Sequence, residues 1–182
     1  ECYHLIFQHL TSRKQTPHLQ WNIATDLAIN STIPLDELPD GGLIPGMPLK
    51  KKDDFNLLPK DIQEKADKMS NFIKSLPRNK SSEWYMKKIL ENKEINDSCE
   101  KIFGNGSGSD SEGNCAGFDF HFDDNDMSES DKALVDAKVK NIVKNAVERA
   151  ERTNSWGSCS SETQQAIRKL LNKTYENERE TK

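Results

Sequence analysis

Apolar side chains recur at every third or fourth position in several stretches of the chain, the spacing that places them on one face of an α-helix. These stretches lie at residues 1–10, 21–30, 60–76, from 81 onward, 128–152 and 163–175. Pro77 ends the third stretch, Ser81 or Ser82 is placed to cap the fourth, and Ser128 or Ser130 to cap the fifth. The pattern therefore predicts a mainly α fold.

Proline and glycine interrupt the helical pattern in two places. Residues 31–60 contain prolines that exclude helix and disfavour a central strand, so we expect a long loop there. Residues 104–117 are rich in Gly, Ser and Asn, which predicts a flexible linker. Apolar and polar residues then alternate at 118–124, as in a short strand or hairpin near residue 120. The predicted fold class is α+β at most, in one domain that spans residues 1–182.

Composition and charge narrow the classes of function. Hydrophobic residues make up 34% and charged residues 31% of the 182 residues, and the formal net charge of −4 gives no support for nucleic-acid binding. The four cysteines are scattered without a Cys-x-x-Cys pair, which argues against a structural zinc site. No secretory signal or apolar run long enough for a membrane span is present. We expect free thiols and a cytoplasmic location, with no membrane partner.

Glu1 and His4 are candidate catalytic and metal-binding residues at the start of the chain. They are three residues apart, which places both on one face of a helix. This is the second half of the zinc motif His-Glu-x-x-His, in which the Glu acts on a zinc-bound water. The first His would precede Glu1, so we expect the chain to be a fragment that begins inside the motif. The alternative is a surface Glu and His on an ordinary helix.

Asp26 and His9 are further candidates around the same helix. A loop through Pro17 allows residues 1–10 and 21–30 to form a helical hairpin that brings Asp26 towards His4 as a third zinc ligand. Asp26 could instead be a buried or capping carboxylate. His9 lies five residues after His4 and overshoots the face that Glu1 and His4 share, so it is a possible metal ligand, a residue that supports a ligand, or a packed helix residue.

Later parts of the chain contain three weaker candidates. His121 is the second choice for the third ligand, and Asp119 could orient a ligand through a hydrogen bond. Tyr85 is predicted near the rim of its helix, with Trp84 and Leu90 packed inward. Its hydroxyl could donate to an oxyanion at the metal, or Tyr85 could serve packing alone.

Taken together, these motifs resemble the metallopeptidase-like domain of bacterial and phage proteins that precedes a von Willebrand factor A-like domain. The matched positions are Glu1, His4, His9, Trp21, Asn22, Ala24, Asp26, Ile29, Asn30, Leu38, Pro39, Gly41, Ser81 or Ser82, Glu83, Tyr85, Asp119 and His121. The His before Glu1 is missing, and the chain ends at Lys182 before a von Willebrand-like domain could begin.

The resemblance implies a zincin-like helical domain, a Zn²⁺ cofactor and a peptide or protein substrate. It implies Glu1 as general base, His4 and Asp26 as metal ligands, and a MoxR-type AAA ATPase as a partner. The alternative function is a non-catalytic helical module that keeps the motif as a relic and docks such a partner. Zinc content distinguishes the two.

Overall fold

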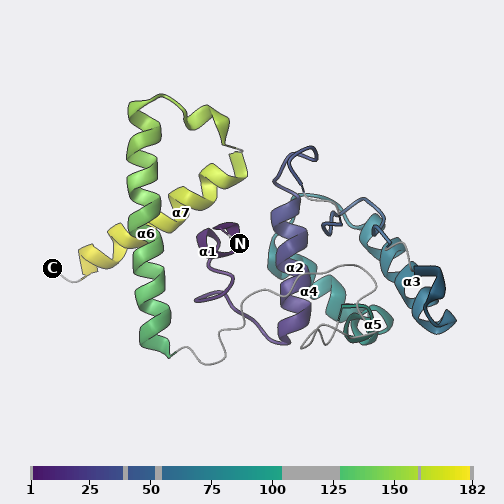
Figure 1. Ribbon diagram of the computed structural model, residues 1–182. Helices are drawn as coiled ribbons and strands as arrows, with labels where there is room; N and C mark the ends of the chain where they lie inside the picture. Colours follow the sequence, from purple (N-terminus) through teal and green to yellow (C-terminus); the bar gives the residue numbers. More distant parts are fainter. Residues whose placement is uncertain (1, 39–40, 52–54, 104–127, 160, 181–182) are drawn as a thin grey trace. The chain divides into compact units, whose positions relative to one another are not determined.

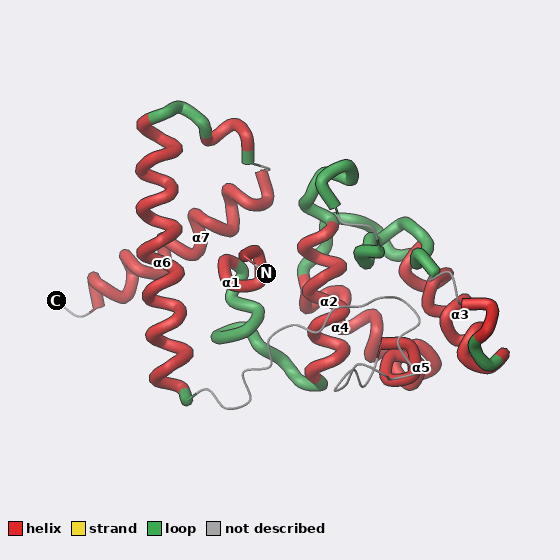
Figure 2. The backbone as a smooth tube through the Cα atoms, in the orientation of Figure 1, coloured by secondary structure: helices red, strands yellow, loops and turns green. Residues whose placement is uncertain are grey.

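The computed structural model describes residues 2–38, 41–51, 55–103, 128–159 and 161–180, and in them the fold is all-α (Figures 1 and 2). Its helices are α1 (Cys2–Ile6), α2 (His18–Asn30), α3 (Lys60–Ser75), α4 (Ser82–Glu91), α5 (Lys93–Phe103), α6 (Glu129–Arg152) and α7 (Ser161–Glu180), with 3₁₀ turns η1 (Phe55–Leu57) and η2 (Trp156–Ser158). The mainly α prediction is confirmed. The predicted linker at 104–117 and strand near residue 120 lie outside the described residues.

The chain divides into two compact units, and each is described by itself. The larger unit is Gln15–His121, and the smaller unit combines Glu1–Lys14 with Phe122–Lys182. Each unit has its own apolar cluster, which is the physical basis of the division. The prediction of a single domain stays a prediction.

Helix α2 is the centre of the larger unit. Trp21, Ile23, Ala24 and Leu27 are each at most 1% exposed, so the helix is buried around nearly its whole circumference. It packs against α4 and α5, and α3 packs against α5. Such a helix shows little apolar periodicity because it has no solvent-facing side. The sequence pattern recovered it only from residue 21.

Helix α4 presents a different face to the core from the one predicted. Tyr85, Met86 and Ile89 are buried, whereas Leu90 is 41% exposed and Trp84 is only partly buried. The buried positions follow a spacing of three and four residues that begins at Ser82. The prediction that Tyr85 lies at the rim, with Leu90 inward, is therefore wrong. The buried face of α4 is rotated by about one residue from the predicted face.

Helix α5 is not predicted as a separate helix by the sequence pattern. Ile95, Cys99, Ile102 and Phe103 are buried at helical spacing, and the Asn92 side chain accepts a hydrogen bond from the Ile95 amide at 3.2 Å. Burial raises the pKa of the Cys99 thiol to about 12. Cys99 is therefore a core residue and not a reactive thiol.

The Pro- and Gly-rich connection between α2 and α3 is held to both helices. The Asn30 side chain donates to the Leu43 carbonyl at 3.0 Å, and the Leu49 amide donates to the Ser70 hydroxyl at 3.0 Å. The Gly46 amide donates to the Ile73 carbonyl at 3.1 Å, and Gly46 has a φ of +84°, which favours glycine. The predicted long loop is confirmed over residues 41–51.

The smaller unit is built from α1, α6 and α7 (Figure 1). Val143, Ile167 and Leu170 form its buried centre. Helix α6 has Ser128 as N-cap in a capping box with Asp131 and ends at Arg152, as the sequence predicts. None of the helices in the described part of the chain combines the length and apolar character needed to cross a bilayer.

Candidate metal centre

Helix α1 ends at Ile6, four residues before the end of the apolar stretch that predicted it. Its C-terminus is a Schellman motif, in which the His9 amide donates to the His4 carbonyl at 2.9 Å and the Gln8 amide to the Leu5 carbonyl at 3.1 Å. Gln8 takes the left-handed position with a φ of +57°, which glycine usually occupies. Because the residue there is Gln, the sequence carries no sign of the turn.

The turn brings the rings of His4 and His9 together. Their centroids lie 5.4 Å apart with an interplanar angle of 72°, and the two residues are 3% and 2% exposed. The expectation that His9 overshoots the face of His4 is therefore wrong, since His9 follows the helix and is not part of it. In a Schellman motif these two positions are the ones that make a side-chain contact, usually between apolar residues.

The spacing of the two rings fits one zinc ion. Zinc–nitrogen distances of about 2.0–2.1 Å and tetrahedral coordination place the centroids of two imidazole ligands roughly 5 Å apart. The Nδ1 atoms of both rings are shielded from solvent. The same separation also suits edge-to-face packing of two aromatic rings. The two uses differ in whether the ring nitrogens are needed, which substitution by Phe can test.

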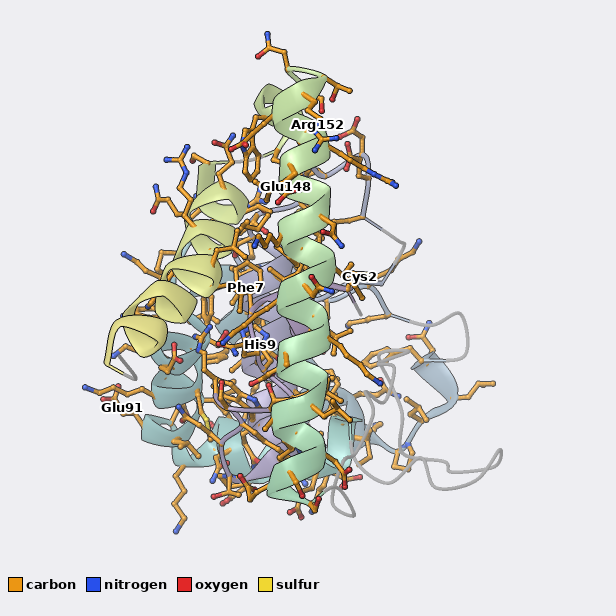
Figure 3. The ribbon with its side chains drawn as sticks, turned by 90° about the vertical axis from the view of Figure 1, so that its left-hand side faces the viewer. Cys2, Phe7, His9, Glu91, Glu148 and Arg152 are labelled. Atoms are coloured by element: carbon orange, nitrogen blue, oxygen red, sulfur yellow. The ribbon has the colours of Figure 1, made fainter. Side chains whose placement is uncertain are left out.

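Residues 8–13 are anchored to the rest of the smaller unit. Gln8 Nε2 and Thr11 Oγ1 both donate to the Asp136 carboxylate of α6, at 3.1 and 2.6 Å. Arg13 donates to the Phe7 carbonyl at 3.1 Å. The rings of Phe7 and His9 stack at 5.5 Å, and Figure 3 labels both residues. These contacts hold the turn that positions His9 against His4.

The structure does not determine where the other predicted ligands lie relative to this pair. Asp26 is half-buried on α2 and belongs to the larger unit, so its pairing with His4 stays a prediction. Glu1, Asp119 and His121 lie outside the described residues. Within residues 2–38, 41–51, 55–103, 128–159 and 161–180, no three His, Cys, Asp or Glu side chains form a group suited to a metal.

Tyr85 lies in the core of the larger unit. Its side chain is fully buried, and its hydroxyl donates to the Pro77 carbonyl at 2.7 Å and lies 3.2 Å from the Ser31 hydroxyl. Burial raises the pKa of Tyr85, which keeps the phenol protonated. These contacts are those of a packing residue. A role as oxyanion donor would require the hydroxyl to leave Pro77, and it stays a prediction.

His18 and Asn22 are a polar pair on α2, of which the motif in the sequence includes only Asn22. The Asn22 amide nitrogen lies 3.3 Å from His18 Nε2, one helical turn away. Asn22 is 2% exposed, so this contact satisfies a buried amide. The signal in the sequence is the spacing of four residues between His and Asn.

Comparison with protein-family models, with curated proteins and with solved structures gives no match for this chain. The family resemblance therefore stays a prediction that rests on the motif residues. The histidine pair and its surroundings are the observations on which a function can be proposed.

Proposed function

We propose that this chain carries part of a zinc-dependent peptidase centre in which His4 is a metal ligand. The observation that supports this most is the buried His4–His9 pair at 5.4 Å, a separation that suits two imidazoles on one zinc. His9 is then a second ligand from this chain, and Asp26 is the proposed carboxylate ligand. Of the possible roles of His9, the proposal therefore selects that of a metal ligand.

Each residue has a definite task in this proposal. Zinc, when bound, supplies a Lewis acid that makes water a nucleophile near neutral pH. Glu1 accepts a proton from the attacking water and returns it to the leaving amine. Asp136 holds the turn through Gln8 and Thr11 and so fixes the ring of His9. A peptide is the proposed substrate.

Zinc affinity of single-ring variants tests the proposal. Replacement of His by Phe keeps an aromatic ring of similar shape and removes both nitrogens. His4→Phe and His9→Phe are each expected to weaken zinc binding at least tenfold, measured by competition with a chromophoric chelator. His18→Phe is the matched control on α2, and its zinc affinity should equal that of the parent chain. A chain with one His added before Glu1 should bind zinc more tightly than the parent.

Two results would count against the proposal. Equal zinc affinity in the parent, His4→Phe and His9→Phe chains would mean that the pair serves ring packing. A lack of zinc binding even in the chain with the added His would remove the metal from the account. Folding of each variant is checked by circular dichroism, so that a loss of structure is not mistaken for a loss of ligand.

A second candidate function is the docking of a partner protein such as a MoxR-type AAA ATPase. The observation that favours it is the solvent-facing side of α6, where Leu134 is 54% and Ile142 is 67% exposed. Exposed apolar side chains on one helix can take part in a protein–protein contact, whereas a single exposed apolar residue is ordinary on a protein surface. In this case Leu134→Ser with Ile142→Ser would abolish complex formation and leave zinc affinity unchanged.

A further inference from the structure

A small pocket lies between the end of α1 and α7 within the smaller unit. Its volume is about 70 Å³. Its lining includes the apolar residues Ile6, Phe7 and Leu170 and the polar residues Gln8, Arg13 and Lys169. A water molecule occupies about 30 Å³ of liquid, so the space suits a group of only a few heavy atoms.

The charged residues that line the pocket are both positive. Arg13 and Lys169 both line it, and no Asp or Glu is among its described lining residues. The Arg13 guanidinium is positioned by its bond to the Phe7 carbonyl at 3.1 Å. A guanidinium presents its N–H donors in a planar fork that matches a carboxylate, and an ammonium adds a second charge. The chemistry of the pocket therefore favours a carboxylate.

The pocket shares a wall with the histidine pair. Phe7 lines the pocket, and its ring stacks on His9 at 5.5 Å. A carboxylate held by Arg13 and Lys169 would lie one side chain away from the proposed metal ligands. This is the arrangement that recognition of a chain end beside a reacting peptide bond requires.

We propose that this pocket binds the terminal carboxylate of a peptide that ends in a small residue. Ile6, Phe7 and Leu170 take the small side chain, and Arg13 and Lys169 take the carboxylate. The role in substrate choice rests on the proposed peptidase function, whereas binding in the pocket needs no metal. The carboxylate could come from a chain terminus or from an Asp side chain, and the two are separated by choice of probe.

The test is a titration of the zinc-free chain followed by two-dimensional NMR. N-acetyl-L-alanine presents a terminal carboxylate, N-acetyl-L-alaninamide is the neutral control, and N-acetyl-L-aspartic acid α-amide presents the carboxylate on a side chain. Saturable shifts at Arg13 and Leu170 are expected with N-acetyl-L-alanine, and no shifts with its amide. N-acetyl-L-tryptophan should bind more weakly because its side chain exceeds the pocket.

Variants then assign the binding groups. Lys169→Gln and Arg13→Gln are each expected to weaken binding of N-acetyl-L-alanine about tenfold. Lys144→Gln, on the exposed side of α6, removes one positive charge elsewhere in the same unit and should leave binding unchanged. Because Arg13 also holds Phe7, the Lys169 variant keeps the test valid if Arg13→Gln alters the fold.

Equal binding of the acid and its amide, or equal loss in the Lys144 and Lys169 variants, would overturn the proposal. Tighter binding of the aspartic acid amide would overturn the assignment to a chain terminus. Zinc affinity is measured separately on His4 and His9 variants, so failure of the pocket and failure of the metal centre give different results.

Discussion

Replacement of Tyr85 by Phe removes one hydroxyl from the core of the larger unit and changes little else in shape. Two hydroxyl protons serve this part of the core. The Tyr85 proton goes to the Pro77 carbonyl at 2.7 Å, and the Ser31 proton goes to the Leu27 carbonyl at 2.7 Å. The 3.2 Å contact between the two hydroxyl oxygens is then left without a proton of its own.

The assignment of one hydroxyl proton to each carbonyl determines how much unfolding free energy each substitution is expected to cost. Tyr85→Phe leaves the Pro77 carbonyl without its short hydrogen bond, which is expected to cost about 1–2 kcal/mol of unfolding free energy. Ser31→Ala is expected to cost less, about 0.5–1 kcal/mol, because the Leu27 carbonyl still accepts the Ser31 amide at 3.2 Å. The coupling energy between the two substitutions should be below about 0.5 kcal/mol, since neither proton is shared.

The assay is urea denaturation followed by tryptophan fluorescence in a Trp156→Phe background. The remaining tryptophans, Trp21 and Trp84, both belong to the larger unit, so the signal reports on that unit alone. Tyr3→Phe removes a phenol from a partly exposed position of the smaller unit and serves as the control. It should leave this transition unchanged.

Three results would refute the reasoning. Tyr85→Phe could be neutral, Ser31→Ala could cost more than Tyr85→Phe, or the coupling energy could exceed about 1 kcal/mol. The last result would mean that the hydroxyls of Tyr85 and Ser31 share a proton. The hydrogen bond from Tyr85 to the Pro77 carbonyl would then be weaker than the one between the two hydroxyls. Each of these results would leave the Tyr85 hydroxyl as a candidate oxyanion donor.

Cys99 is expected to resist alkylation near neutral pH, whereas Cys2 reacts readily because it is exposed. Peptide mapping measures this, and equal labelling would contradict it. As the pH rises from the ordinary thiol pKa of 9.0 towards about 12, unfolding releases the Cys99 proton, so stability falls by up to about 4 kcal/mol. Cys99→Ala should flatten that part of the pH profile. Asp136→Ala should destabilise the smaller unit by roughly 1–3 kcal/mol, because Gln8 and Thr11 lose a charged acceptor. Denaturation followed by the tryptophan of that unit measures the loss, and Asp136→Asn, which keeps an acceptor oxygen, should lose less.

The sequence predicts the elements whose boundaries have a chemical marker. Ser128 begins α6 through a capping box, Ser81 accepts from the Trp84 amide at 3.2 Å, and Pro77 follows the end of α3. These signals are local, so they survive in a single sequence. The rotation of α4 is not local, because it depends on which neighbours cover Tyr85.

The central pair of the candidate site could not be foreseen for a related reason. Helical spacing separates His4 from His9, and only the left-handed backbone at Gln8 returns His9 to His4. Glycine at that position would have signalled the turn, and Gln does not. His4 and His9 can each be identified in the sequence from their residue type. Their contact, by contrast, depends on the backbone conformation between them.

The measurement that tests the zinc centre most directly is long-range ¹H–¹⁵N NMR of the imidazole nitrogens during titration with equimolar zinc. We predict that the ring nitrogens of His4 and His9 shift together and that those of His18 stay unchanged. Unchanged His4 and His9 nitrogens, or a shift of the His18 nitrogens to the same extent, would contradict the zinc centre.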